Sequence, residues 1–231
     1  MFSKWTRFNR LGHLWNWILE DHPPIPGTLM KNGLPERIVL WVDGVGGFLI
    51  CLSNKVTLGQ AVPGTTVDIP ILADLSGKHA TIHRDGENYL VEPHGTVLLH
   101  GDRILEPTLL KDGAELTLGR DVQIQFHTPH PLSTTARLNF TSHYHTEPRC
   151  DAILLVSQSI VLGPSQQNHI LCRQWPDDIV IFQRQNKLFC RSKQPVKLDG
   201  KPLPSTTPVQ CGQRISMEGC VISLEEVKGG I

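Results

Sequence analysis

The sequence predicts an all-β protein of two similar sandwiches, preceded by one short amphipathic helix. Two observations lead to this prediction. From Ile38 onward, short apolar runs are broken by Gly, Asp and Asn, a pattern typical of sandwiches and barrels. In addition, landmarks found in residues 37–127 recur in residues 136–227. Self-similarity of this kind indicates one structural unit used twice.

Three pairs of short sequences mark the two units. Gly101 and Gly113 correspond to Gly200 and Gly212 at the same offset along the chain. The full pairs are Val56–Gly59 with Ile160–Gly163, Val97–Gly101 with Val196–Gly200, and Asp112–Leu116 with Cys211–Ile215. Because both units share the strand pattern, differences in function are expected in their loops.

Apolar residues at steps of three and four predict a helix over roughly residues 3–20. They are Trp5, Phe8, Leu11, Trp15, Ile18 and Leu19. Pro23 and Pro24 end the helix, because proline lacks a donor and disfavours helix in the residue before it. The helix and a proline-rich linker are assigned to residues 1–35. The apolar face is expected to pack on the β units, with a partner-docking or membrane-surface helix as alternatives.

The first unit is expected over residues 36–128. Its strands are bounded by Gly, Asp and Asn, and a hairpin turn is expected at Arg84–Asn88. The predicted strands are Ile38–Val42, Phe48–Leu52, Lys55–Leu58, Ala80–His83, Tyr89–Glu92, Leu116–Leu118 and Val122–Phe126. The boundary falls at Thr128–Pro131, and the second unit is expected over residues 132–229.

The most specific local motif is Asp74–Ile82, with the sequence DLSGKHATI. Gly59-Gln60 precedes it, and Gly95-Thr96 and His100-Gly101 follow it. Residues 38–126 thereby resemble a forkhead-associated (FHA) domain, and residues 136–227 resemble a degenerate second copy. The arrangement is similar to two-copy FHA proteins of planctomycete-type bacteria. The resemblance implies eleven-stranded sandwiches of the FHA type and recognition of phosphothreonine peptides by loops at one end.

The resemblance also implies a set of phosphopeptide-binding positions. Ser76 stands where the family has the hydroxyl that binds phosphate, and His79 stands where the family has an internal loop brace. A phosphothreonine brings about two negative charges and three acceptor oxygens, which hydroxyls, backbone N–H groups and cations can satisfy. The candidate positions are Gln60, Ser76, Gly77, Lys78, His94, Gly95 and Thr96.

Two arginines of the family pattern are replaced here. Gln60 and Gly77 stand in their positions, and His94 or Gly95 stands where the family has asparagine. Lys78 offers a point charge, which clamps phosphate less well than a guanidinium fork. The loss of two charge-assisted hydrogen bonds weakens phosphate binding by roughly 10²–10⁴-fold. A partner that binds the same loops without phosphate is therefore the alternative.

The second unit is expected to lack phosphate ligands. Trp175–Asp178 stands where the Ser-Arg-x-His pattern would lie, and the stretch between Gly163 and Gly200 is about five residues shorter than its counterpart. A structural or partner-binding role is expected for this unit.

Composition argues against several other functions. Lys plus Arg and Asp plus Glu each number 22, so no basic excess favours nucleic acid. No apolar stretch reaches the about 18 residues of a membrane span. The six cysteines show no C-x-x-C spacing, which argues against a metal or redox site and suggests a reducing cytoplasm. His143-Tyr144-His145 with Glu147 lacks a third clear metal ligand.

No nucleophile elbow or ordered triad occurs, so no enzyme and no cofactor are predicted. The predicted function is non-catalytic protein recognition, as an FHA-type adaptor in Ser/Thr-kinase signalling. The alternative is a scaffold protein whose FHA-like sandwiches serve assembly without phosphate. The identity of the partner and the oligomeric state are left open.

Overall fold

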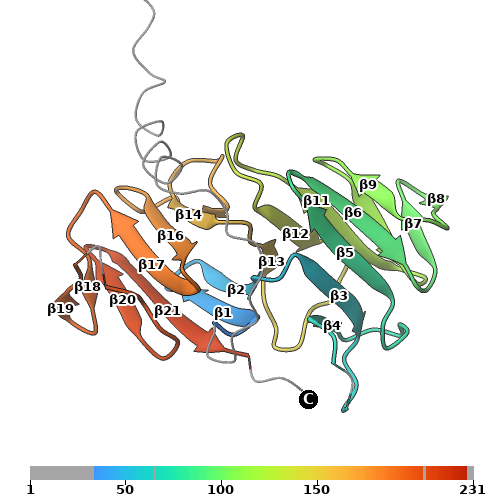
Figure 1. Ribbon diagram of the computed structural model, residues 1–231, viewed down its shortest axis with the longest axis horizontal. Coiled ribbons are helices and arrows are strands. Elements are labelled where there is room, and N and C mark those ends of the chain that lie inside the picture. The colour runs from blue at the N-terminus through green and yellow to red at the C-terminus, as the bar shows by residue number, and fades with distance from the viewer. Residues whose placement is uncertain (1–33, 65, 205–206, 228–231) are drawn as a thin grey trace, which may run out of the picture. The chain divides into compact units, whose positions relative to one another are not determined.

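The computed structural model describes residues 34–64, 66–204 and 207–227. All regular secondary structure in these ranges is β, which confirms the all-β part of the predicted fold class (Figure 1). The predicted N-terminal helix lies outside the described residues.

Twelve of the strands form one continuous sheet, which we call the long sheet. In spatial order its strands are β19 (Lys201–Pro202), β18 (Lys197–Leu198), β20 (Arg214–Met217), β21 (Cys220–Glu226), β1 (Arg37–Val42), β2 (Gly46–Cys51), β13 (Ala152–Leu155), β12 (Ala136–Phe140), β11 (Val122–His127), β10 (Glu115–Leu118), β7 (Val97–Leu99) and β8 (Asp102–Arg103).

Two smaller sheets complete the fold. The five-stranded sheet has the order β4 (Ile69–Ile71), β3 (Lys55–Gln60), β5 (Ala80–Asp85), β6 (Asn88–Pro93) and β9 (Thr108–Leu110). The four-stranded sheet has the order β15 (Ile170–Leu171), β14 (Ser159–Gly163), β16 (Ile179–Arg184) and β17 (Lys187–Ser192).

The two halves of the long sheet have matching strand orders. The sequence β8-β7-β10-β11-β12-β13 on one side corresponds to β19-β18-β20-β21-β1-β2 on the other. The smaller sheets match as well, since Leu58 pairs with Ala80 in one and Leu162 with Ile179 in the other. Strand β9 has its counterpart only in the isolated bridge between Leu188 and Val209.

One half of the long sheet, the half that contains β21, is completed by a hairpin from a distant part of the chain, whereas the other half is completed by the hairpin that directly follows β11. Strand β1 pairs with β21, the last described strand, while β12 pairs with β11. Strands β2 and β13 meet as parallel neighbours in the middle of the sheet, as Figure 1 shows. The predicted unit limits, 36–128 and 132–229, stay a prediction. Strands β1 and β2 lie within the first of these ranges, but they pair with β21 and β13, which lie within the second.

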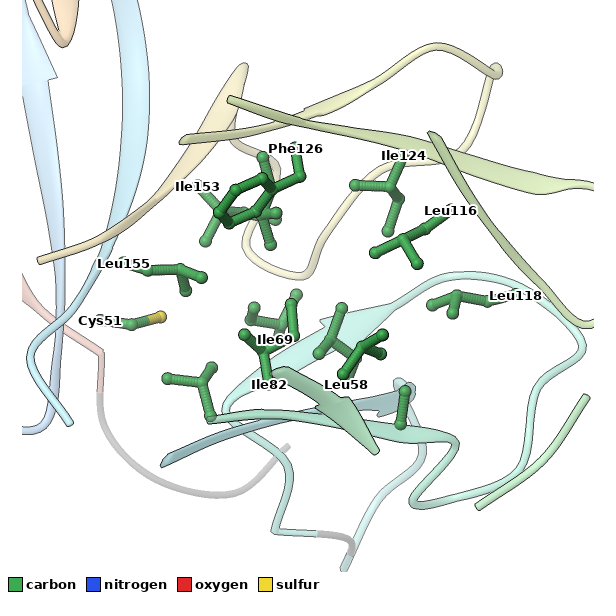
Figure 2. Packing of buried hydrophobic residues seen from close by; sticks show 14 of the residues in the cluster. Cys51, Leu58, Ile69, Ile82, Leu116, Leu118, Ile124, Phe126, Ile153 and Leu155 are labelled. Carbon is green, nitrogen blue, oxygen red and sulfur yellow. The ribbon is translucent and has the colours of Figure 1, made fainter. Parts of the chain in front are cut away.

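Two buried clusters lie on opposite faces of the long sheet. The first core joins it to the five-stranded sheet through residues such as Leu58, Ile82 and Phe126 (Figure 2), and the second core joins it to the four-stranded sheet. Because side chains alternate between faces, β2 and β13 contribute to both. Leu49 lies in the first core, whereas its neighbour Phe48 lies in the second. The central strands therefore hold the two cores together.

The segment between β11 and β12 contacts both smaller sheets. The Tyr89 hydroxyl of β6 donates to Thr134 O at 2.6 Å. The Thr135 hydroxyl donates to Ser159 O in β14 at 2.8 Å. His169 Nε2 lies 3.1 Å from Ser133 Oγ. This segment is thus a second connection between the halves.

Candidate functional site

Three segments meet at one end of the first core, and we call this region the apex. They are the β4–β5 loop (residues 72–79), the β6–β7 loop (residues 94–96) and the β10–β11 turn (residues 119–121). Strand β3 ends beside them, because Gln60 N donates to Ser76 O at 3.0 Å. The predicted binding positions therefore lie close to one another, although the sequence separates them.

The buried imidazole of His79 links the three segments. Its Nδ1 accepts a hydrogen bond from Ser76 N at 3.1 Å. Its Nε2 lies 2.9 Å from Thr96 O and 3.1 Å from Gly119 N. The tautomer with its proton on Nε2 fits Ser76 N and Thr96 O, since Nε2 then donates to Thr96 O and Nδ1 remains an acceptor. Gly119 N also donates to Thr96 O, at 2.9 Å.

Backbone contacts of the same residue add to this brace. His79 O accepts from His94 N at 2.9 Å and from Gly95 N at 2.8 Å, while His79 N donates to Leu58 O at 2.8 Å. His79 is only 4% exposed, so a ligand at the surface does not reach it. The structural role expected for this residue stays a prediction.

Two glycines of the motif are required by close approach. An ideal Cβ on Gly59 would stand 1.9 Å from Gly77 O, and one on Gly95 would stand 2.4 Å from His79 Cε1. Real Cβ atoms do not come this close to other heavy atoms. The glycines of the motif therefore allow the loops to pack against strand β3 and against the imidazole.

Of the predicted binding positions, the exposed ones are Ser76, Lys78, His94 and Thr96. Gln60, Gly77 and Gly95 are half-buried. His94 is partly engaged, because its Nε2 lies 2.8 Å from the hydroxyl of the buried Thr81. The structure thus leaves the Ser76 hydroxyl and the Lys78 ammonium exposed on one loop, beside Thr96 on the next.

The acidic residues near the apex differ in their effect. Asp68 is directed away from a ligand, because its Oδ2 accepts from the backbone N and the hydroxyl of Thr57, each at 2.7 Å. Asp121 accepts from the Tyr144 hydroxyl at 2.9 Å, and this bond raises the pKa of Tyr144. Asp74 is exposed on the β4–β5 loop itself.

Arg120 is a cation at the apex that sequence reasoning missed. It is exposed in the β10–β11 turn, directly after Gly119. Gly119 N donates to Thr96 O in the β6–β7 loop, and an ideal Cβ on Gly119 would stand 2.9 Å from Leu75 Cδ2 in the β4–β5 loop. These approaches depend on tertiary packing, which no local pattern reports.

His143-Tyr144-His145 lies in the long β12–β13 loop, which packs against the apex. Leu72 N donates to His145 O at 3.1 Å, and Glu147 N donates to Pro70 O at 2.9 Å. The His143 ring lies on that of Tyr144, with centroids 4.1 Å apart. Within residues 34–64, 66–204 and 207–227, no group of three or more His, Cys, Asp or Glu is placed to hold a metal ion.

The corresponding end of the second half is built differently. Asp178 occupies the register position of His79, since it precedes Ile179 as His79 precedes Ala80. Its Oδ1 accepts from Asn168 Nδ2 at 2.7 Å, and burial raises the pKa of this carboxyl. Trp175, at the position matching Ser76, is only 5% exposed. This end therefore presents no serine hydroxyl at the matched position.

A family model matches the segment that contains the braced loops, residues 56–119. That family is the FHA domain. The resemblance expected from the sequence is confirmed for this segment, which we call the FHA segment. FHA domains are protein-interaction modules, generally non-catalytic, and the match implies recognition of phosphopeptides.

Two solved structures of FHA domains resemble the chain. The solution structure of the FHA domain of an Arabidopsis thaliana hypothetical protein is 21% identical, with a TM-score of 0.30, over 50% of this chain and 96% of that one. The FHA structure of Rv0020c is 18% identical, with a TM-score of 0.24, over 36% of this chain and 84% of that one. A search of curated proteins found no match. Among the described residues, no helix is long and apolar enough to span a membrane.

Proposed function

We propose that the apex of the FHA segment binds phosphothreonine peptides and that the protein is a non-catalytic adaptor in Ser/Thr-kinase signalling. The observation that carries this proposal is the intact brace around His79. It connects the loop of Ser76 to the loop of Thr96 through hydrogen bonds of 2.9 and 3.1 Å. A binding site needs side chains on rigidly supported loops, and this network provides the support.

Ser76 and Lys78 are the proposed ligands of the phosphate. Both are exposed, and Lys78 forms no ion pair with any other described residue. A hydroxyl and an ammonium group together offer donors to two phosphate oxygens. Without arginine at positions 60 and 77, we expect binding to be weaker than the complete family pattern would give.

We further propose that the second half is a degenerate FHA-like copy with a structural role. The matching strand orders of the two halves support this proposal. The buried Trp175 and the Asp178–Asn168 pair in place of a serine loop and a histidine brace support the loss of phosphate binding. In this proposal the whole described chain is a pair of FHA-type sandwiches.

Fluorescence anisotropy with two labelled peptide libraries tests the proposal. One library carries a fixed central phosphothreonine among degenerate residues, and the other carries threonine. Wild type should prefer the phosphorylated library, and Ser76→Ala should weaken that binding about tenfold or more. Ser53→Ala is the matched control, because Ser53 lies beyond the opposite end of strand β3. Equal affinity of wild type for both libraries contradicts the proposal.

The second candidate is a scaffold that uses the same sandwiches without phosphate. The observation in its favour is that the positions of both family arginines hold Gln60 and Gly77. The double variant Gln60→Arg, Gly77→Arg separates the two functions. Gly77 is not among the described glycines with positive φ, so no left-handed backbone conformation opposes a side chain there. Stronger binding of the phosphorylated library by this variant favours the adaptor, and no gain favours the scaffold.

A further inference from the structure

We propose that Arg120, in the β10–β11 turn, supplies to the bound phosphate the guanidinium that positions 60 and 77 lack. This inference rests on the proposed phosphopeptide function of the apex. It assigns a binding role to a segment that the sequence motif does not include.

The position of the turn supports the assignment. Gly119 N lies 2.9 Å from Thr96 O in the β6–β7 loop. An ideal Cβ on Gly119 would stand 2.9 Å from Leu75 Cδ2 and 3.5 Å from Asp74 O in the β4–β5 loop. Residue 119 therefore touches both loops that carry the proposed ligands. The next Cα is about 3.8 Å farther along the chain, so Arg120 starts beside the residue that precedes Ser76.

The side chain of Arg120 is available for a ligand. It is exposed, and it forms no ion pair with any other residue in the described ranges. Its sequence neighbour Asp121, a natural partner for it, is already engaged by the Tyr144 hydroxyl at 2.9 Å. Tyr144 belongs to the β12–β13 loop, which is fixed against the β4–β5 loop by the bond from Leu72 N to His145 O. The Tyr144 hydroxyl thus holds one oxygen of Asp121, and in this proposal Tyr144 is a positioning residue for that carboxylate.

The chemistry of arginine fits the missing function. A guanidinium presents parallel N–H donors that bind two phosphate oxygens at once, whereas the Lys78 ammonium acts as a point charge. A phosphate held by the Ser76 hydroxyl would then be contacted both from the β4–β5 loop and from the β10–β11 turn. Recognition would depend on the β10–β11 turn as well as on the two loops of the motif.

Peptide binding to four variants of the full chain tests this inference, with the phosphothreonine library as probe. Arg120→Ala should lower the affinity about tenfold or more, and Arg120→Lys should recover only part of the loss. Lys111→Ala is the charge-matched control, because the exposed Lys111 lies near the opposite end of strand β10, and its affinity should equal that of wild type. In wild type, the Nε–Hε NMR signal of Arg120 should shift on addition of the phosphorylated library and not of the unphosphorylated one.

Tyr144→Phe tests the positioning role. Without the hydroxyl, Asp121 is free to pair with Arg120, so the affinity should fall, and a second substitution, Asp121→Asn, should restore it. A merely structural role of Tyr144 would give no such rescue.

The outcomes separate the inference from the proposed function. If wild type prefers the phosphorylated library but Arg120→Ala binds it as Lys111→Ala does, the inference is wrong and the proposed function stands. If wild type shows no preference, both are wrong. If wild type binds the phosphorylated library but the Nε–Hε NMR signal of Arg120 does not shift, the inference is also wrong.

Discussion

The imidazole of His79 occupies the space that a side chain on Gly95 would need. An ideal Cβ at Gly95 would stand 2.4 Å from Cε1 and 2.6 Å from Nδ1 of the ring. The same Nδ1 accepts the hydrogen bond from Ser76 N. The glycine of one loop and the exposed serine of the other are therefore coupled through one buried ring.

Replacing Gly95 with alanine should disturb the apex and destabilise the fold. Gly95 does not have a positive φ, so the effect is steric, and overpacking of this kind costs about 1–3 kcal/mol. The amide signal of Ser76 and the ring signals of His79 should shift in NMR spectra, and phosphopeptide affinity should fall.

Gly86→Ala provides the control for this prediction. Gly86 has φ of 59° and no atom within 4 Å of an ideal Cβ. Its substitution should cost about 1–2 kcal/mol through backbone strain alone and leave the apex unchanged. Unshifted Ser76 and His79 signals in Gly95→Ala would show that the two loops are not coupled in this way.

A fragment of residues 53–157 should fold on its own. It keeps strands β3 to β13 and loses from the buried first core only Val39, Leu49 and Cys51. A fragment of residues 34–129 should not fold cooperatively, because it lacks β12 and β13 and exposes the apolar face that β1 and β2 turn to the second core. Thermal unfolding followed by circular dichroism compares the two.

Cooperative folding of the fragment 34–129 would contradict this prediction. It would mean that hairpin β1–β2 can replace hairpin β12–β13 beside β11, as the unit limits taken from the sequence imply. The two outcomes also decide whether the unit limits describe folding units or only repeated sequence.

The strands were predictable from the sequence, but their partners were not. Residues 38–42 and 48–52 stand out as apolar runs, and the structure has strands at Arg37–Val42 and Gly46–Cys51. An apolar run reports burial, not which sheet buries it. The run Phe48–Cys51 is buried on both faces, and this pattern is typical of a central strand between two layers.

In the candidate site, too, local motifs can be read from the sequence, whereas contacts between distant segments cannot. The expectation that His79 braces the loops came from the motif, because the histidine and the glycines it contacts lie within a recognisable pattern. The engagement of Asp68 by Thr57 and the approach of Gly119 to the β4–β5 loop arise from contacts across strands and turns. Such contacts leave no periodic signal in the sequence.

Stability should fall as the pH drops from 7 to 5, because two histidines are buried in neutral form. The His130 and His169 rings stack with centroids 5.8 Å apart. Burial lowers the pKa of both, that of His169 to about 3, with His130 and Arg137 adding to the shift. Histidine in the unfolded chain has a pKa of about 6.5. As the pH falls from 7 to 5, the unfolded chain therefore takes up protons at these positions that the folded chain does not.

This linkage has a definite sign. The stabilisation is fully present above the unfolded pKa and is lost as the pH falls toward the folded value, by up to about 1.4 kcal/mol per pH unit for each histidine. Urea unfolding at pH 5, 6, 7 and 8 measures it, and His169→Gln should reduce the slope. A free energy of unfolding that stays constant from pH 7 to 5 would contradict the prediction.

The cysteines should be nearly inert toward a thiol-reactive maleimide in the folded protein. Five are buried, and burial raises the pKa of Cys150 to about 11 and those of Cys172 and Cys190 to about 12. Burial raises the pKa of Cys211 as well, but this thiol alone among the six is partly exposed, so it should react first. Mass spectrometry should find one fast modification, absent in Cys211→Ser, and all six in urea. Fast labelling of Cys51 in native buffer would mean that the central strand β2 opens readily.

Hairpin β1–β2 pairs with β21, in the half of the long sheet built from the end of the chain, and this pairing affects how molecules can associate. Two molecules can trade this hairpin without making any contact that one molecule lacks, because the receiving strands β21 and β13 are the same in both. Along the chain, the three residues 52–54 connect this hairpin to β3. Protein refolded at high concentration should therefore contain dimers that have exchanged this hairpin, whereas protein refolded at low concentration should not. The apparent mass of a preparation would then depend on the protein concentration at which it was refolded.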